Sequence, residues 1–168
     1  MALSEAVDGA GSDYKSVFAV ILGTGVGAGF SYNKKIIVGP NKLTGEWGQN
    51  PIPGPMDDYE KSVKRHCGRV GAIEVFLSGP GLENYYKFIS GSKKSSREIV
   101  SLYKENDSFA NEVMDIYFER IARSFSTFVN ILDPDIIVCG GGMSEIDDIY
   151  SEVPVSYTHL RAHETVVY

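Results

Sequence analysis

Apolar residues at the start of the chain follow the pattern of strands joined by turns. Val17–Leu22 is a β-branched and aromatic run, which predicts a buried strand. A glycine-rich turn follows it, and "GFSY" and "KIIVG" then predict two further strands around an Asn33-Lys34 turn. We expect these three strands to form a β-meander.

Helical spacing replaces this pattern further along the chain. The opening "MALSEAVDGAG" reads as the last turns of a helix closed by Gly9. Further helices are predicted over Gly71–Leu77, Leu82–Ile89, Ser96–Tyr103 and about 110–132. In the last of these, apolar residues recur every three or four positions, which predicts a broad buried stripe that ends at Asp133-Pro134.

A final strand and helix are predicted after this long helix. "DIIVC" is a short apolar strand, "GGG" a turn, and Ser144 a plausible N-cap of a helix from Glu145 to about Val153. The segment "GPNKLTGEWGQNPIPGP" is punctuated by Gly and Pro, so we expect an ordered loop there. The order of elements indicates an α/β fold, with a three-stranded meander followed by helices and a further strand.

Composition limits the class of protein. The 168 residues are 43% hydrophobic and 23% charged, as in one globular domain or part of a larger one. The net charge of −6 leaves no dense basic face, so we expect no nucleic-acid partner for this segment. There are two cysteines, and neither a leader peptide nor an apolar span near the length that crosses a membrane is present. We therefore expect a reduced, cytoplasmic chain with no membrane partner.

Both ends of the chain differ from those of a typical domain. The first helix begins without a cap, so we expect a segment ahead of Met1. Val155–Thr165 resembles the translation of a sequencing-adaptor DNA. We therefore expect a domain over 1–154 and a non-native, disordered tail over 155–168, whose two histidines are not a metal site.

The glycine turn "GTGVGAG" is the first candidate for chemistry. Glycines after a strand let backbone N–H groups approach an anion, and phosphate is the usual ligand of such a turn. No helix is predicted to begin at these glycines and no Gly-Lys-Ser/Thr follows, which excludes a dinucleotide-binding fingerprint and a Walker loop. A purely structural hairpin remains an equal alternative.

A second glycine cluster changes this balance. "IIVCGGGMSEIDDIY" reads as strand, bare turn and helix, an arrangement that can accommodate a nucleotide. A packing turn is the structural alternative. Two such glycine turns separated by a long helix occur in the same order along the chain as in the sugar kinase and actin-like ATPase architecture.

Residues 20–49, "VILGTGVGAGFSYNKKIIVGPNKLTGEWGQ", resemble the signature of the ROK family of sugar kinases and sugar-responsive repressors. The likeness continues through "HCGRVGAIEVFLSGPGL" and "NILDPDIIVCGGGMS", which look most like the bacterial fructokinase (mannokinase) branch. It implies the C-terminal lobe of an actin-like ATPase (ribonuclease H-like) fold. It also implies ATP-dependent phosphorylation of a hexose such as fructose or mannose, with Mg²⁺ carried by the nucleotide, and a homodimer.

Two other functions remain open under the same resemblance. One is a sugar-sensing transcriptional repressor, which shares this domain and carries a DNA-binding head ahead of it. The other is a non-catalytic domain that dimerises. The phosphate turn favours the kinase, because a repressor needs only to bind sugar.

The resemblance assigns roles to individual residues. Those implied to bind ATP are Gly23, Thr24, Gly25, Val26, Gly27, Ala28, Gly29, Gly141, Gly142 and Met143. Those implied to bind the sugar are Glu46, Gln49 and Glu74. Carboxylates suit this role because each accepts hydrogen bonds from two hydroxyl donors.

The chain departs from the family at the metal site. The family holds a structural zinc with one His and three Cys, and the corresponding residues here are Gln49, Arg65, Cys67 and Ala72. One ligand of the four survives, and the neighbouring His66 cannot rebuild a tetrahedron. We expect no structural zinc.

The family's general base is an Asp in an "NDA" segment ahead of the helix that reads "ALSEA" here. That position lies upstream of Met1, so no residue of this chain is assigned a catalytic role. Loss of a general base typically lowers the rate by about 10² to 10⁴. We therefore expect these 168 residues alone to be inactive.

Overall fold

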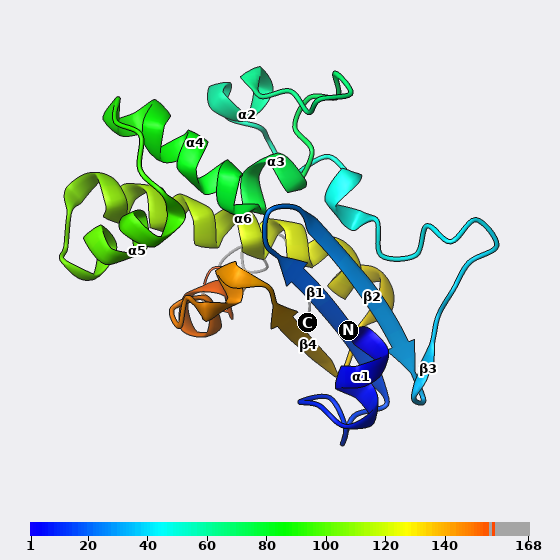
Figure 1. Ribbon diagram of the computed structural model, residues 1–168. Helices are drawn as coiled ribbons and strands as arrows, with labels where there is room; N and C mark the ends of the chain where they lie inside the picture. Colours follow the sequence, from blue (N-terminus) through cyan, green and yellow to red (C-terminus); the bar gives the residue numbers. More distant parts are fainter. Residues whose placement is uncertain (155, 157–168) are drawn as a thin grey trace, which may run out of the picture.

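The computed structural model describes residues 1–154 and 156, which form a four-stranded sheet flanked by helices (Figure 1). The strands are β1 (Ser16–Leu22), β2 (Val26–Tyr32), β3 (Lys35–Ile36) and β4 (Ile136–Gly140). Their order in the sheet is β3-β2-β1-β4, with antiparallel pairing within the meander and β4 parallel to β1. The predicted meander, the long helix and the further strand are confirmed. The predicted tail over 155–168 lies outside the described residues, apart from Ser156.

Helices cover both faces of the sheet, and several more gather beyond one of its ends (Figure 1). The α-helices are α1 (Ala2–Val7), α2 (Asp58–Ser62), α3 (Glu74–Leu77), α4 (Gly79–Ser90), α5 (Ser96–Lys104) and α6 (Ser108–Leu132). Two 3₁₀ helices are η1 (Trp47–Gln49) and η2 (Gly142–Glu145). The long helix α6 lies behind the sheet in this view, and α1 lies in front of it.

Six of the seven residues of β1 are buried, so both faces of this strand have to be covered. Phe18, Val20 and Leu22 belong to the main core cluster together with the buried side of α6. The rings of Phe18 and Phe128 stack with their centroids 3.9 Å apart. On the opposite face, Ala2 of α1 is buried and lies against β2. The sheet is thus a central layer, as a strand buried on both faces requires.

Local capping fixes where the helices begin. Ser78 caps α4 by accepting from the Gly81 N–H, so the helix begins at Gly79, earlier than the apolar spacing predicted. Ser95 and Glu98 form a capping box at the start of α5. The long helix α6 ends at Leu132, as predicted, before Asp133 in the left-handed conformation.

Three predicted features near the site differ in the structure. The helix predicted over Gly71–Leu77 is confined to α3, because Gly71 has a positive φ of 70° and Ala72 forms an isolated bridge with Pro51. The helix predicted from Glu145 with Ser144 as its N-cap is wrong at its start. The Ser144 hydroxyl donates to the Gly141 carbonyl within η2, and helical residues resume at 149. Helix α2 lies just after the predicted Gly- and Pro-rich loop, in a segment for which no helix was predicted.

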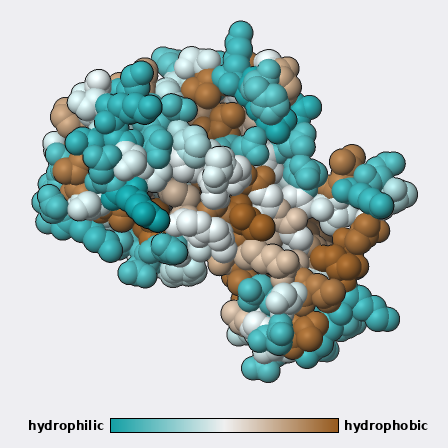
Figure 2. Space-filling model, viewed as in Figure 1, coloured by the Kyte–Doolittle hydropathy of each residue, from teal (hydrophilic) through white to brown (hydrophobic). Residues whose placement is uncertain are grey.

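Apolar side chains gather over α1 and the sheet on the face shown in Figure 2, whereas the helical part of that face is mostly hydrophilic. Exposed apolar residues of α1 and the strands include Leu3, Val7, Ile21 and Ile36. Within the part of the chain that the structure describes, none of the helices combines the length and hydropathy needed to span a bilayer.

Candidate active site

The glycine turn is a tight hairpin at the end of β1. The Gly23 N–H donates to the Gly25 carbonyl at 3.0 Å, and Leu22 and Val26 pair across the turn. The Gly23 carbonyl accepts from the Gly79 N–H at 2.8 Å. The turn is therefore joined directly to the first residue of α4.

Parallel pairing of β4 with β1 brings the second glycine cluster to the same edge. Ile21 pairs with Gly140, so Gly141 and Gly142 follow β4 beside the hairpin. Gly141 has a φ of 90°, and a Cβ there would collide with the Leu22 carbonyl oxygen. Only glycine fits at this close approach of the two strands.

Both glycine clusters line one cavity of about 460 Å³. Of the residues predicted to bind ATP, Gly23, Thr24, Gly142 and Met143 line it. Gly25 and Gly141 adjoin these residues in the chain. Val26, Gly27, Ala28 and Gly29 lie within strand β2, where the Ala28 N–H donates to the Gly45 carbonyl at 2.9 Å.

The remaining lining of this cavity comes from the starts of two helices. Gly79 and Pro80 begin α4, and Ser95, Ser96 and Arg97 stand at the start of α5. Helix N-termini carry a partial positive charge, which favours an anion. The N–H groups of Gly79 and Ser96 at these two starts already donate to the Gly23 carbonyl and to Glu83 Oε1. The sequence prediction missed these residues, although the "SSRE" capping box signals the start of α5.

Glu83 of α4 also lines the cavity and joins the two helices. Its Oε1 accepts from the Ser96 N–H and hydroxyl, each at 2.9 Å. The cavity therefore combines the positive ends of two helices with a carboxylate whose second oxygen can accept from hydroxyl groups.

The three residues predicted to bind sugar fall into two groups. Glu46 and Gln49 contact each other, with Gln49 Nε2 donating to Glu46 Oε2 at 2.7 Å. Glu74, at the start of α3, accepts from the Val26 N–H at 3.4 Å, which places it against the glycine hairpin. The Gln49 amide has two N–H donors, of which one donates to Glu46 and the second remains for a sugar hydroxyl.

Comparison of this sequence with known protein families identifies its family. The chain matches the ROK family over residues 1–166. It belongs to the ROK family.

Relatives of this ROK chain include two hexosamine kinases. It is 38% identical over 157 residues to an N-acetyl-D-glucosamine kinase of Vibrio atlanticus, covering 91% of this chain and 52% of that protein. It is 35% identical over 161 residues to an N-acetylgalactosamine kinase of a Shewanella species, covering 91% of this chain and 50% of that protein. The chain spans about half the length of these relatives.

Solved structures share the fold. The ROK hexokinase of Thermus thermophilus matches with a TM-score of 0.82 at 21% identity, over 94% of this chain and 53% of that one. A ROK glucokinase of Streptomyces griseus, solved with glucose and AMPPNP, matches with a TM-score of 0.80 at 21% identity, over 94% and 55%. A ROK transcriptional regulator homologous to the E. coli MLC protein matches with a TM-score of 0.79 at 20% identity, over 94% and 41%. The α/β actin-like fold is confirmed.

The loop that joins the Glu46–Gln49 pair to Glu74 in this ROK chain is held by hydrogen bonds. Ile52 and Gly71 are joined by a backbone bond of 2.8 Å, and Asn50 and Ile73 by one of 2.9 Å. In the described part of the chain, there is no group of three or more His, Cys, Asp or Glu side chains that could hold a metal ion. The absence of structural zinc stays a prediction, which metal analysis of the purified protein tests.

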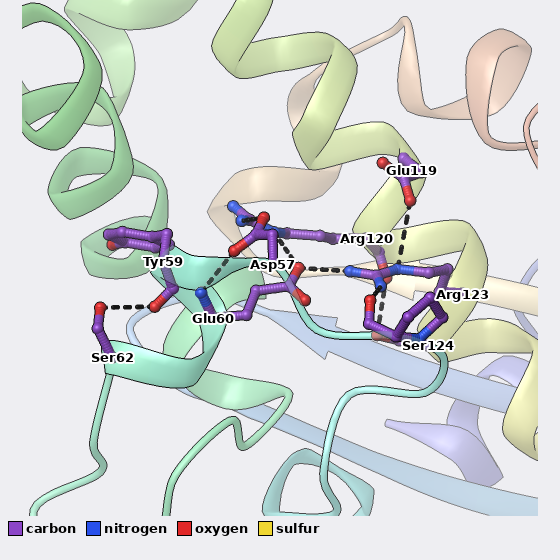
Figure 3. Close-up of polar contacts among 9 residues, drawn as sticks. Asp57, Tyr59, Glu60, Ser62, Glu119, Arg120, Arg123 and Ser124 are labelled. Carbon is purple, nitrogen blue, oxygen red and sulfur yellow. Dashed lines mark hydrogen bonds and ion pairs between the residues drawn. The ribbon is translucent and has the colours of Figure 1, made fainter.

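The base of the same loop is anchored by a buried ionic cluster (Figure 3). Glu60 of α2 is 1% exposed, and its Oε1 accepts from both Arg120 and Arg123 of α6. Arg120 also pairs with Asp57 at 3.1 Å. A buried carboxylate held by two guanidinium groups fixes α2, and with it the loop, against the long helix.

Proposed function

We propose that the protein that carries this chain transfers the γ-phosphoryl group of ATP to a hydroxyl group of a hexose. The observation that carries this proposal is the single cavity shared by the two glycine clusters and the starts of α4 and α5. Nucleotide phosphates suit such a cavity because they accept hydrogen bonds from backbone N–H groups at close range. The identity of the ROK relatives as sugar kinases supports the same reaction.

The roles proposed for individual residues follow from their positions. Following the family resemblance, Gly23 and Thr24 would hold the phosphates, and Gly142 and Met143 would lie against the adenosine, since both pairs line the same cavity. Glu46 and Glu74 would accept hydrogen bonds from sugar hydroxyls. Mg²⁺ would arrive with the nucleotide and offset the charge of its phosphates. Catalysis would then consist mainly of positioning and neutralisation of charge.

The hexose that we propose first is an N-acetylated hexosamine. The relatives reported above are N-acetylglucosamine and N-acetylgalactosamine kinases, and neither is a fructokinase. The fructokinase branch suggested by the sequence therefore has no support from these relatives. Fructose and mannose remain acceptors to be compared in the same assay.

Sugar sensing without catalysis is a second candidate, because the ROK transcriptional regulator shares this fold. A sensor needs the sugar carboxylates but has no use for a nucleotide cavity. ATP affinity therefore separates the two candidates. The proposed homodimer is a further point for sedimentation velocity to decide.

The deciding experiment measures ADP release by the full protein with ATP, Mg²⁺ and each candidate sugar, together with ATP binding by calorimetry. We expect ATP binding and turnover with at least one hexosamine. Binding of a sugar without any affinity for ATP would favour the sensor. Absence of both activities would overturn the assignment of this site.

A further inference from the structure

A short turn at the tip of the loop between Glu46 and Glu74 carries two arginines. Lys64 and Val70 form an isolated antiparallel bridge, and the Arg65 N–H donates to the Arg69 carbonyl at 2.8 Å. The Gly68 N–H closes the turn on the Arg65 carbonyl at 2.8 Å. Arg65 and Arg69 are therefore held at fixed positions on one small hairpin-like tip.

The first arginine contacts one of the proposed sugar-binding carboxylates. Arg65 Nε lies 3.1 Å from Glu74 Oε1, with the two side chains 19% and 27% exposed. The other oxygen, Glu74 Oε2, accepts from the Val26 N–H at 3.4 Å. Glu74 is thus held from both sides, by the loop tip and by the strand that follows the glycine turn.

The second arginine reaches the other sugar-site group. Arg69 Nη1 donates to the Gln49 carbonyl at 2.7 Å, and Gln49 Nε2 in turn donates to Glu46 Oε2 at 2.7 Å. The same tip therefore contacts both Glu74 and the Glu46–Gln49 group. Arg69 is exposed, so its contact is screened by solvent and weaker than that of Arg65.

We propose that Arg65 is a positioning residue that sets the orientation of Glu74 for the sugar, with Arg69 supporting Gln49 and Glu46 in the same way. This proposal rests on the proposed function for the role of the two carboxylates. A free glutamate side chain rotates among several rotamers, whereas one with each oxygen held is oriented before the sugar arrives. Each carboxylate oxygen keeps a further lone pair for a hydroxyl donor. The positive charge of Arg65 also offsets the negative charge of Glu74, which would otherwise repel the phosphates of the bound ATP.

The first test compares three variants of the full protein by steady-state kinetics. Arg65→Met removes the contact, Arg65→Lys keeps the charge, and Lys64→Met removes a neighbouring exposed charge that has no partner among the contacts of the described residues. We expect Arg65→Met to raise the sugar KM about tenfold or more and to leave the ATP KM unchanged, with partial recovery in Arg65→Lys. Lys64→Met should match the parent. Equal changes in both KM values, or an Arg65→Met protein that behaves like Lys64→Met, would overturn the proposal.

The second test does not require catalysis. Hydrogen exchange in the same proteins reports the protection of amides over 64–74 and at Val26. Faster exchange there in Arg65→Met than in Lys64→Met supports the positioning role, and equal exchange overturns it. If the parent protein phosphorylates no sugar, the proposed function fails, and this measurement still decides whether Arg65 holds Glu74.

Discussion

Arg120 Nε lies 2.8 Å from Glu60 Oε1, and both side chains are almost completely excluded from solvent, at 2% and 1% exposure. The Arg120 guanidinium also lies 4.1 Å from the centre of the Tyr85 ring. This pair joins α2 to α6 across 60 residues of sequence. It holds the base of the loop whose tip contacts the proposed sugar site.

Glu60→Gln should lower the free energy of unfolding by about 3 kcal/mol or more, because it removes the buried negative charge that two guanidinium groups share. Their other carboxylate partners, Asp57 and Glu119, are about half exposed. Chemical denaturation measures the change. Asp58→Asn on the same helix is the control, since its pair with Lys61 is exposed and should contribute less than about 1 kcal/mol. Equal effects of the two substitutions would contradict the structural role of the cluster.

Tyr117→Phe tests how α3 and the start of α4 are held. The buried Tyr117 hydroxyl donates to the Leu77 carbonyl at 2.9 Å, one residue before the cap of α4. Its loss leaves a buried carbonyl without this donor and should cost about 1 to 3 kcal/mol in stability. Tyr150→Phe removes a similar bond from an exposed hydroxyl to the Ser144 carbonyl and should change stability by less than about 0.5 kcal/mol. A larger loss in Tyr150→Phe than in Tyr117→Phe would refute this order.

Substitution of two neighbouring glycines should affect different properties, nucleotide binding at Gly142 and stability at Gly141. Gly142→Val places a side chain where a Cβ meets nothing within 4 Å, so the fold should survive while the cavity proposed to bind the nucleotide is narrowed. Gly141→Ala forces a side chain onto a φ of 90° against the Leu22 carbonyl and should cost about 1 kcal/mol or more. Calorimetry with AMPPNP and thermal melting separate the two effects. Unchanged nucleotide affinity in a folded Gly142→Val protein would argue against this cavity as the ATP site.

The two cysteines should differ in reactivity. A hydrogen bond from the Arg69 backbone, and then the Arg65 guanidinium, lower the pKa of the exposed Cys67 thiol. Burial raises the pKa of Cys139 to about 11. Because the thiolate is the nucleophile, iodoacetamide at pH 8 should modify Cys67 first, and Arg65→Met should slow that reaction. Mass spectrometry of the peptides gives both rates, and faster modification of Cys139 would be inconsistent with the structure.

Asp135 should make stability depend on pH. Hydrogen bonds from the Ser16 backbone and hydroxyl, followed by the Lys15 backbone, lower its pKa below the ordinary value of 3.8. A carboxyl whose folded pKa is depressed stabilises the fold above its unfolded pKa, and this contribution is lost as the pH falls through the folded pKa. The stability difference between the parent and Asp135→Asn, measured by urea denaturation, should therefore be full at pH 7 and shrink below pH 4. A difference that stays constant down to pH 2 would exclude this linkage.

Much of the fold could be predicted from local patterns. The meander, α6 and the two glycine clusters depend on alternation, helical spacing and the absence of side chains, all of which are visible in one chain. Short helices could not be found in this way. Helix α2 has five residues, and the start expected at Ser144 failed because its hydroxyl bonds back to Gly141. Contacts outside the helix decide such short elements, since their own hydrogen bonds are too few.

The sequence by itself determined the family and supplied the glycine clusters and carboxylates of the candidate site. Only the tertiary structure decided which of them meet. Parallel pairing of β4 with β1 brings Gly142 to Gly23 across more than a hundred residues, and the loop tip brings Arg65 to Glu74. Such contacts depend on long-range packing, and neither residue spacing nor local propensity records which distant segments will pack together.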